Sequence, residues 1–489
     1  MMNSISIDEL LASPEGKTLE FKRDLSSPKP LLKTLVAFAN TAGGRLVIGV
    51  DDDRQIIGVS APLDEEERLC NLIADSIAPR LVPNVEMLTV EGKTLLVVEV
   101  FVSGNRPQWL KSEGADAGVY VRLGSTNRQA DAALIGELRR SVEGVAFDEM
   151  PMPDLGLENL DLDAARQLFS GISTLDQQAL RTLKLVTLYQ DQMVPTKGAV
   201  LLFGKERGLH FSDAWVQCGR FIGTDKAQIF DHVDIREHLP TAVDSVMLFL
   251  KKHAMRGADF STVRRKDVWS IPLLLLREAV INALVHADYS QRGAPIRISF
   301  FDDRIEVESP GILLPGMTVE DMRQGVSKIR NHVIARVFRE LNLIEQWGSG
   351  VRRIYQEAEA QGLPEPQFVE VGMRLRVVVY LAESMPLGRT TEQVTEQVAP
   401  ERLESRLESR LESNLAAKVM ILLGKAEAGK ANLAKLLGHK SVSGELHKQI
   451  KRLLTLELIE MTLPDKPNSR LQRYRLTAHG RGYLALTAP

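Results

Sequence analysis

The sequence predicts an α/β protein built from several domains. Its 489 residues correspond to about three domains of ordinary size. Short segments rich in β-branched residues alternate with amphipathic helical segments through most of the chain. A repetitive, highly charged stretch at residues 383–414 separates a long N-terminal part from a smaller C-terminal part. Together these observations favour folded modules joined by a tether.

The composition is that of an ordinary globular protein, with 44% hydrophobic and 26% charged residues. No apolar run approaches the roughly 18 residues that a membrane helix needs, and the N-terminus lacks the apolar core of a signal peptide. Cys70 and Cys218 lie far apart in the sequence, which indicates neither a disulfide framework nor a metal cluster. We therefore predict a cytoplasmic protein with no membrane partner.

The first module is placed at residues 1–145. Its expected helices are 31–40 and 64–76, and its expected strands are 45–50, 94–102 and 118–122. It carries four motifs in order: E-x₄-EFK at 15–22, AFANT-x-GG at 37–44, IGVDD at 48–52 and VR-x-GS at 121–125. These motifs resemble the Schlafen-like, AlbA-type nucleic-acid domain. The resemblance implies that this module contacts DNA or RNA, and Lys22 and Arg122 are its candidate contacts.

In nuclease members of that family, two glutamates and one aspartate form a metal-dependent site that cuts RNA. The E-x₄-E spacing matches Glu15 and Glu20, and the aspartate would be Asp51 or Asp52. Clustered carboxylates hold Mg²⁺ or Mn²⁺, which activates water and stabilises charge on phosphate. The alternative is that Glu20 and Lys22 form a structural ion pair and that the module only binds nucleic acid.

The second segment, residues 146–265, offers no recognisable chemistry. Residues 147–162 are rich in Pro, Asp and Gly, which predicts a linker. Helices are expected after it, with strands at 199–203 and 214–221. We interpret this segment as a bridge between the modules on either side.

The third module, residues 266–382, contains the most informative helix. Glu278, Asn282 and His286 follow one another at i, i+4 and i+8, so they share one face of an otherwise apolar helix. Glu278 is a candidate base that polarises a water, and the amide oxygen of Asn282 is a candidate Mg²⁺ ligand beside a phosphate. The alternative is a polar stripe that faces solvent.

Strands at 297–301 and 304–308 follow this helix, then Ser-Pro-Gly at 309–311, GVSKIRN at 325–331 and WGSGVRR at 347–353. This order resembles the GHKL ATP-binding fold of gyrase, chaperone and histidine-kinase ATPases, and more closely a bacterial branch often labelled helicase-like. The resemblance implies a pocket for ATP with Mg²⁺ and a weak ATPase whose base is Glu278. Its remaining candidate nucleotide contacts are Asn282, His286, Ser309, Gly311, Lys328, Arg330, Asn331, Gly348 and Gly350.

One position departs from that family. The usual fold carries Asp-x-Gly after the second strand, and its aspartate accepts the adenine amino group. Ser309 stands there in this chain, and a hydroxyl lacks the charge assistance of a carboxylate. Weakened nucleotide binding, altered specificity and a pocket that no longer binds nucleotide therefore stay open as alternatives.

The tether at 383–414 repeats Thr-Glu-Gln-Val twice and Arg-Leu-Glu-Ser three times. A period of four drifts by about 40° per repeat around a helix, and it places like charges at i and i+4. This pattern favours a solvated tether over a dimerising coil. A homo-oligomer stays an alternative, because GHKL proteins often dimerise.

The last module, residues 415–489, is predicted to be a winged helix. Helices at 416–423, 431–437 and 443–456 precede a strand pair at 458–461 and 473–476. The module carries 13 Lys and Arg against 5 Asp and Glu, which favours a polyanionic partner. Its candidate DNA contacts are Lys448, Lys451, Arg452, Arg470 and Arg473. A winged helix used for protein contacts is the alternative.

The sequence 424–431 nearly matches a P-loop, but Ala431 replaces the hydroxyl that ligates Mg²⁺. We therefore predict no helicase motor. The favoured function is a nucleic-acid-binding protein that acts as an ATP-responsive transcriptional regulator. The alternative is a divalent-metal-dependent RNase acting on tRNA or ribosomal RNA, or as a defence effector. A non-enzymatic scaffold is the third interpretation.

Overall fold

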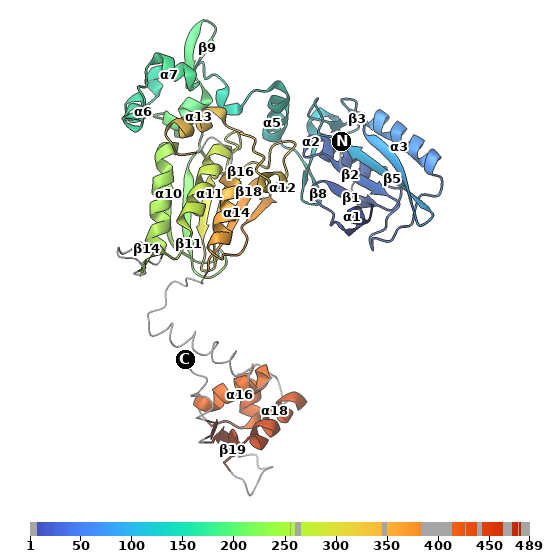
Figure 1. Cartoon of the computed structure of the whole chain (residues 1–489), viewed down its shortest axis with the longest axis vertical. Helices are drawn as coiled ribbons and strands as arrows, with labels where there is room; N and C mark the ends of the chain where they lie inside the picture. Colours follow the sequence, from blue (N-terminus) through green and yellow to red (C-terminus); the bar gives the residue numbers. More distant parts are fainter. Residues whose placement is uncertain are drawn as a thin grey trace. The chain divides into compact units, whose positions relative to one another are not determined.

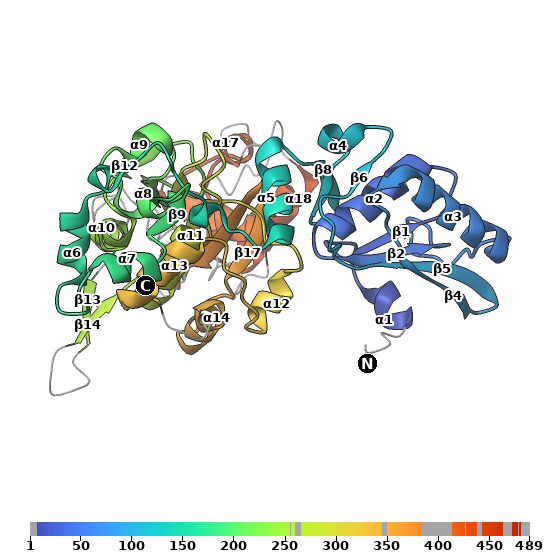
Figure 2. The same cartoon turned by 90° about the horizontal axis from the view of Figure 1, so that it is seen from above.

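The fold is given by a computed structural model (Figures 1 and 2). It describes residues 7–254, 256–259, 266–344, 350–382, 413–425, 427–437, 443–462, 472–477 and 479–480. The chain divides into two compact units, Met1–Met385 and Pro386–Pro489. Gly348, Arg470 and the repeats of the predicted tether lie outside the described residues.

The N-terminal part of the first unit is a four-stranded sheet covered on both faces. Its helices are α1 (Ile7–Ala12), α2 (Pro28–Asn40), α3 (Pro62–Ser76), α4 (Gly114–Ala117) and α5 (Ala132–Glu143). Its strands are β1 (Leu19–Lys22), β2 (Gly44–Ile48), β3 (Ile77–Ala78), β4 (Asn84–Val90), β5 (Lys93–Val100), β6 (Trp109–Leu110), β7 (Tyr120–Leu123) and β8 (Thr126–Gln129). The sheet has the order β1-β2-β5-β4; β1 and β2 run parallel, and the other neighbours are antiparallel.

Alternation along the strands explains the two covered faces. Leu46 and Ile48 of β2 pack with α2 and α3, whereas Val47 between them packs with α1. Because successive strand residues point to opposite faces, a strand that is apolar on both faces is covered on both. Gly43 makes the predicted turn from α2 to β2 at φ +75°, where a Cβ would lie 2.8 Å from the Val100 carbonyl oxygen.

The rest of the first unit is built on a six-stranded sheet. Its helices are η1 (Phe147–Glu149), η2 (Leu157–Asn159), α6 (Leu162–Phe169), α7 (Gln177–Thr182), α8 (Lys197–Phe203), α9 (Arg207–His210), α10 (Leu239–His253), α11 (Leu273–His286), α12 (Val319–Arg323), α13 (His332–Glu340) and α14 (Gly350–Ala360). Its strands are β9 (Val186–Tyr189), β10 (Gln192–Pro195), β11 (Val216–Phe221), β12 (Ile229–Ile235), β13 (Arg256–Asp259), β14 (Lys266–Trp269), β15 (Ile296–Phe300), β16 (Arg304–Pro310), β17 (Gln367–Val371) and β18 (Arg374–Tyr380).

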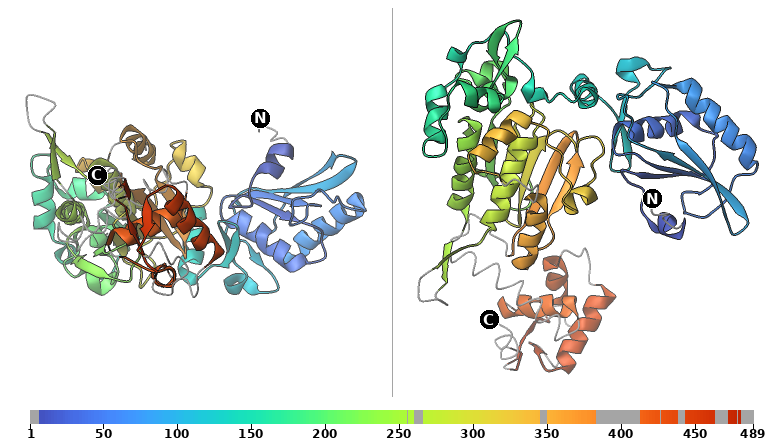
Figure 3. Two further views of the ribbon diagram at one scale, coloured as in Figure 1. Left: turned by 90° about the horizontal axis from the view of Figure 1, so that it is seen from below. Right: turned by 45° about the horizontal axis from the view of Figure 1, so that its top comes forward.

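The strand order of the large sheet is β12-β11-β15-β16-β18-β17. Helices α10 and α11 pack side by side against it, and α14 packs on α11 (Figures 1 and 3). One core cluster extends from Leu160 to Leu381. Residues 146–265, which we interpreted as a bridge, therefore supply β11, β12 and α10 to the same sheet and core as residues 266–382.

One local prediction in this region is wrong, and the residues expected to form a linker are packed into the fold. The strand expected at 199–203 is the helix α8, whose first turn is capped by Thr196 through a 3.2 Å bond from the Ala199 N–H. A short apolar run buried on all sides has no periodicity that separates strand from helix, and the Thr196 cap was the missed signal. The expected linker is tightly packed, since the buried carboxylate of Asp148 accepts the N–H groups of Val333 and Ile334 at 2.7 and 3.0 Å.

The described residues of the second unit form three helices and a two-stranded antiparallel sheet, in the predicted order. These are α16 (Asn414–Lys425), α17 (Lys430–Leu436), α18 (Gly444–Thr455), β19 (Ile459–Met461) and β20 (Tyr474–Leu476). All five contribute to one small apolar core. None of the helices in the described ranges combines the length and hydrophobicity that crossing a bilayer requires.

Candidate functional site

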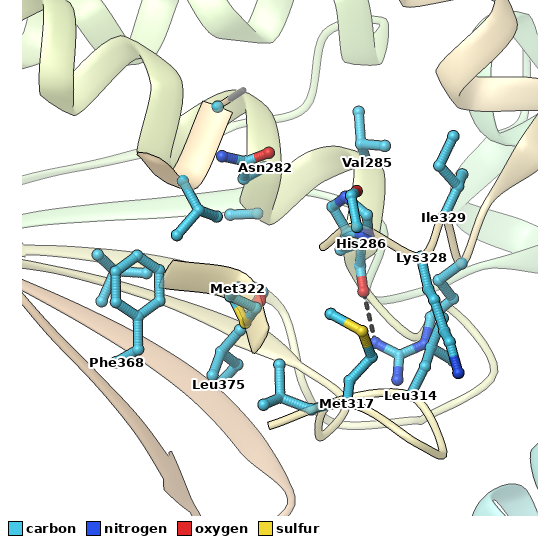
Figure 4. Close-up of a pocket in the computed structure, with 18 of the residues that line it drawn as sticks. Asn282, Val285, His286, Leu314, Met317, Met322, Lys328, Ile329, Phe368 and Leu375 are labelled. Atoms are coloured by element: carbon cyan, nitrogen blue, oxygen red, sulfur yellow. Dashed lines mark hydrogen bonds between the residues drawn. The ribbon is translucent and has the colours of Figure 1, made fainter. Parts of the chain in front are cut away.

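A cavity of about 440 Å³ opens beside α11. Its walls come from α11, from β16, from the loop 311–330 and from α14, with β17 and β18 closing one side. We call it the α11 pocket. Figure 4 shows Asn282 and His286 projecting from α11, with Met317, Met322 and Leu375 among the residues around them. The volume and the mixture of apolar walls with a few polar groups are typical of a small-ligand site.

The polar row of α11 faces this pocket. Glu278 and Asn282 both line it, and the Asn282 amide nitrogen donates to the Glu278 carboxylate at 3.4 Å. Most other residues of α11 are apolar and are buried in the core, whereas Leu274 near its start is exposed. With its nitrogen turned toward Glu278, Asn282 keeps its amide oxygen as an acceptor or metal ligand.

Gly350 is the first residue of α14 and approaches this row closely. A Cβ at this position would collide with the Glu278 carboxylate and would lie 3.3 Å from the Asn282 amide nitrogen. A larger residue at this position would therefore displace the Glu278 carboxylate from its place beside the start of α14. The start of α14 brings its free backbone N–H groups to the edge of the pocket, which is an arrangement suited to phosphate oxygens.

His286 lines the inner end of the pocket, and its backbone carbonyl accepts from Arg330 at 2.6 Å. Burial lowers the pKa of its imidazole to about 4, and the neighbouring Arg330 acts in the same direction. The ring is therefore neutral at pH 7. It can form hydrogen bonds with a ligand in the pocket, but it supplies no positive charge to a phosphate.

The pKa of His286 predicts a pH effect on stability. The unfolded chain protonates this residue near its ordinary value of 6.5 and the folded chain only near 4. As the pH falls from about 6.5 toward 4, the unfolded state binds more protons, so the free energy of unfolding decreases. We expect His286→Gln to lose less stability than the wild type over this range. Urea unfolding of both proteins at pH 7 and pH 5 measures the difference, and equal losses would contradict this assignment.

Ser309 and Gly311 lie where β16 ends. The Ser309 side chain is buried and borders the pocket together with Val307 on the same face of the strand. Gly311 has φ +99°, and a Cβ there would lie 2.5 Å from a guanidinium nitrogen of Arg330 and 2.9 Å from the Asp288 Cβ. Gly311 is therefore required by the turn, and Ser309 offers the hydroxyl expected from the sequence.

Two predicted nucleotide contacts prove to have structural partners. Arg330 forms a 2.6 Å ion pair with Glu137 and donates to the carbonyls of His286 and Ile312. The buried Asn331 amide donates to the carbonyls of Val285 and Ala287 at 2.8 and 2.7 Å. Asn331 thus joins the start of α13 to the end of α11 and does not line the pocket. Arg330 borders the pocket, but its donors are engaged elsewhere.

Lys328, another predicted nucleotide contact, lies at the rim of the pocket. Its side chain is exposed, and its ammonium donates to the Pro315 carbonyl at 2.7 Å. Arg339 on α13 and Arg353 on α14 also line the pocket, and the sequence interpretation missed both. Within the described ranges, the buried Nε of Arg339 has no hydrogen-bond partner. Arg353 lies one helical turn after Gly350. Its spacing from this predicted contact could therefore have identified it as a pocket residue from the sequence.

The acidic residues of the N-terminal module are each held by a different partner. Glu20 pairs with the buried Arg122 and, at 2.5 Å, with Lys22. A Glu15 carboxylate oxygen accepts the Phe21 N–H at 2.9 Å, and an Asp51 carboxylate oxygen accepts the Gln55 N–H at 2.8 Å.

This arrangement does not fit the metal centre of the nuclease hypothesis. The part of the chain that the structure describes contains no group of three or more His, Cys, Asp or Glu residues that could hold a metal ion. The structural pair of Glu20 and Lys22, weighed as the alternative, is present. The predicted nucleic-acid contact Arg122 is 1% exposed, and its guanidinium pairs with Glu20 and donates to Asn127 and to the Gly16 carbonyl.

The second unit exposes most of its predicted basic contacts. Lys448, Lys451 and Arg452 are exposed along α18, and Arg473 is exposed just before β20. The apolar residues of α18, Leu446, Ile450 and Leu453, form its buried face. Helical spacing therefore turns the basic residues away from the core.

Three family models match the chain. "Schlafen, AlbA_2" matches residues 15–131. "Putative ATP-dependent DNA helicase recG C-terminal" (HATPase_c_4) matches residues 293–379, which begin after the polar row of α11. "Filamentation induced by cAMP protein Fic-like, C-terminal domain" matches residues 416–477. No curated protein matches the chain.

Eight solved chains match this one, and two of them are described as follows. The DIP2311 protein from Corynebacterium diphtheriae is 21% identical, with 99% of this chain and 98% of that chain covered and a TM-score of 0.41. The "N-terminal Domain of Putative ATP-dependent DNA Helicase RecG-related Protein" from Nitrosomonas europaea is 32% identical, with 25% of this chain and 90% of that chain covered and a TM-score of 0.21. The chain thus contains one segment similar to the Schlafen AlbA_2 domain and another similar to the HATPase_c_4 domain.

Proposed function

We propose that this chain is a nucleic-acid-binding protein, acting in transcriptional regulation, whose state responds to ATP in the α11 pocket. The observation that carries the proposal is the pocket itself: Glu278 and Asn282 meet the start of α14 at one end of a cavity of about 440 Å³. The match to a HATPase_c_4 domain supports a nucleotide as the ligand, and the Schlafen AlbA_2 match supports nucleic acid as the partner.

The pocket has the chemistry that a nucleoside triphosphate needs. Apolar side chains such as Leu313, Met317 and Phe368 offer a surface for a flat base. Arg339 and Arg353 supply positive charge for phosphates. When Mg²⁺ accompanies the nucleotide, the Asn282 oxygen is the ligand this chain provides, because Mg²⁺ is commonly held by few protein ligands and by the phosphates.

The loop that lines the pocket is also joined to the N-terminal module. The Gly316 N–H donates to the Thr41 carbonyl at 2.7 Å, and Arg330 pairs with Glu137 on α5. Ile312 belongs to the same apolar cluster as residues of β7 and α5. A ligand that favours one arrangement of this loop therefore changes contacts to the nucleic-acid module, provided it binds the two arrangements unequally.

A direct experiment is titration of the full chain with ATP and Mg²⁺ by calorimetry. The proposal expects saturable binding that is weakened in Asn282→Ala. Absence of binding, together with no thermal shift by ATP, would favour the scaffold interpretation in which Ser309 marks a pocket that has lost its nucleotide.

Hydrolysis makes a separate prediction. We expect Glu278→Ala to bind ATP nearly as well as the wild type and to release phosphate at least about a hundredfold more slowly, since a positioned general base contributes that much. Phosphate release by Glu340→Ala, which changes an exposed carboxylate on α13 outside the pocket lining, serves as the matched control. Unchanged phosphate release by Glu278→Ala would exclude Glu278 as the base.

The basic face of α18 supports duplex DNA as a partner of the second unit. Three exposed cations on one helix match the pattern of a helix that enters a major groove. The proposed role in transcription depends on DNA binding by this face of α18. It requires that the single substitutions Lys451→Gln and Arg452→Gln each weaken binding to duplex DNA. Equal binding by wild type and variants would remove α18 from the interface.

A further inference from the structure

A second cavity, of about 350 Å³, lies on the other side of the pocket loop. Its walls come from α5 and the residues after it, from Arg106, and from loop residues 314–332. Leu314, Lys328, Ile329 and Arg330 line both this cavity and the α11 pocket, so the loop is a shared wall. We call it the α5 cavity. We infer that the α5 cavity binds a phosphate group, carried by a nucleic-acid backbone or by a free nucleotide.

The charge of the lining favours an anion. Arg106, Arg140, Lys328 and Arg330 border the cavity, against the carboxylates of Glu137 and Asp288. Glu137 is already paired with Arg330. The Asp288 carboxylate accepts hydrogen bonds from the Ser290 hydroxyl and the Gln291 amide.

The other three cations form no close ion pair among the residues that the structure describes, and Arg140 acts on the Glu137 carboxylate only through space. Arg106 donates to Ser103 and Ser141, Lys328 donates to a carbonyl, and Arg140 lies over the Phe147 ring at 5.3 Å. The end of α5 adds about half a negative charge, which leaves the excess of positive charge in place.

The arginines present suitable donors. Arg106 is fixed by its two bonds, and its buried Nε has no hydrogen-bond partner within the described ranges. A buried N–H group without a partner is unfavourable, so an acceptor from a ligand would stabilise it. Stacking of Arg140 on Phe147 leaves the N–H edge of its guanidinium available. Guanidinium groups with free edges suit the oxygens of a phosphate, with which they form paired, charge-assisted hydrogen bonds.

The two possible sources of the phosphate differ in whether they depend on the proposed function. Binding of a nucleic-acid backbone rests on the proposed function of the N-terminal module. Binding of a free nucleotide or pyrophosphate does not. The test therefore uses inorganic pyrophosphate and a single-stranded oligonucleotide as separate probes of the full chain.

Arg140 and its neighbour Arg139 give a matched pair of variants. Arg140 lines the α5 cavity, whereas Arg139 is exposed on the same helix and lies outside the lining. We expect Arg140→Gln to weaken pyrophosphate binding by a factor of about ten, and Arg140→Glu to weaken it more. Arg139→Gln and Arg139→Glu should bind as the wild type does. Arg140→Lys, which keeps the charge, should retain most of the affinity and shows that the fold tolerates a change at this position.

The oligonucleotide identifies the source. If the cavity holds a backbone phosphate, Arg140→Glu also weakens the oligonucleotide and lowers the slope of its salt dependence by about one. If it holds a free nucleotide, only pyrophosphate is weakened. The inference is overturned if the wild type, Arg140→Gln and Arg140→Glu bind both probes equally, or if the wild type binds neither. Failure of the proposed function would be seen in a different measurement. The wild type would then not bind ATP, or Asn282→Ala would bind ATP as tightly as the wild type.

Discussion

Replacing Glu20 with glutamine should lower the free energy of unfolding of the first unit by about 3 kcal/mol. The carboxylate pairs with Arg122, whose side chain is 1% exposed, and with Lys22. Removing the negative charge leaves the Arg122 guanidinium buried without compensation, and breaking a buried pair from one side costs about 3–5 kcal/mol. Glutamine keeps the shape of the side chain, so the loss reports mainly the charge.

Urea unfolding of the wild type and Glu20→Gln measures this effect. Asp51→Asn is the matched control, because the Asp51 carboxylate accepts one backbone N–H in an exposed turn and is expected to change stability by less than about 1 kcal/mol. If Glu20→Gln proves as stable as the wild type, Glu20 is not the partner that keeps Arg122 buried. The stability of Glu20→Gln also decides how nuclease assays are interpreted. If the variant is unstable, loss of RNA cleavage would not identify Glu20 as a catalytic carboxylate.

Replacing Asn282 with alanine should weaken ATP binding by a factor of about 10 to 100. Asn282 lines the α11 pocket from the face of α11 that is turned toward the start of α14. A hydrogen bond or metal contact to a charged ligand contributes about 1.5–3 kcal/mol, and each 1.4 kcal/mol is a factor of ten in affinity. The variant should fold normally, because the amide makes only a long 3.4 Å bond to Glu278 among the interactions that the structure records for it.

The control for this variant is Gln324→Ala, which removes an exposed amide of the neighbouring loop that does not line the pocket. Calorimetry with ATP and Mg²⁺ should give the wild-type affinity for Gln324→Ala and a weakened affinity for Asn282→Ala. Equal affinities for all three proteins would place the nucleotide elsewhere.

The fold was predictable where periodicity was strong and where both faces of an element have distinct surroundings. The amphipathic helix α3 and the β-branched strand β5 were found for that reason, and β15 and β16 were found with their turn. Helix α8 was mistaken for a strand because every residue of its apolar run is buried, so the sequence carries no period. The interpretation of residues 146–265 as a bridge could not anticipate that β11 lies next to β15 in one sheet.

Spacing alone predicted the candidate site only where its residues lie close in sequence, whereas Ser309, Gly311 and Gly350 were assigned to it through the family resemblance and also line the pocket. Helical spacing brought Glu278 and Asn282 together, and the structure places both in one pocket. Arg330 was assigned to nucleotide because its carboxylate partner, Glu137, lies 193 positions away and leaves no mark in the local pattern. Asn331 was assigned in the same way, although its amide bonds to two carbonyls at the end of α11. Arg339 was missed because an arginine on an amphipathic helix ordinarily faces solvent.

The most direct test of the account is the affinity of the full chain for a labelled oligonucleotide and for duplex DNA, measured with and without ATP and Mg²⁺. The account predicts that ATP changes at least one of these affinities several-fold in the wild type, and that the change disappears in Asn282→Ala. Linkage requires the nucleic acid to change the affinity for ATP by the same factor. Saturable binding of ATP with identical nucleic-acid affinities in its presence and absence would contradict the claim that the pocket controls the nucleic-acid-binding state.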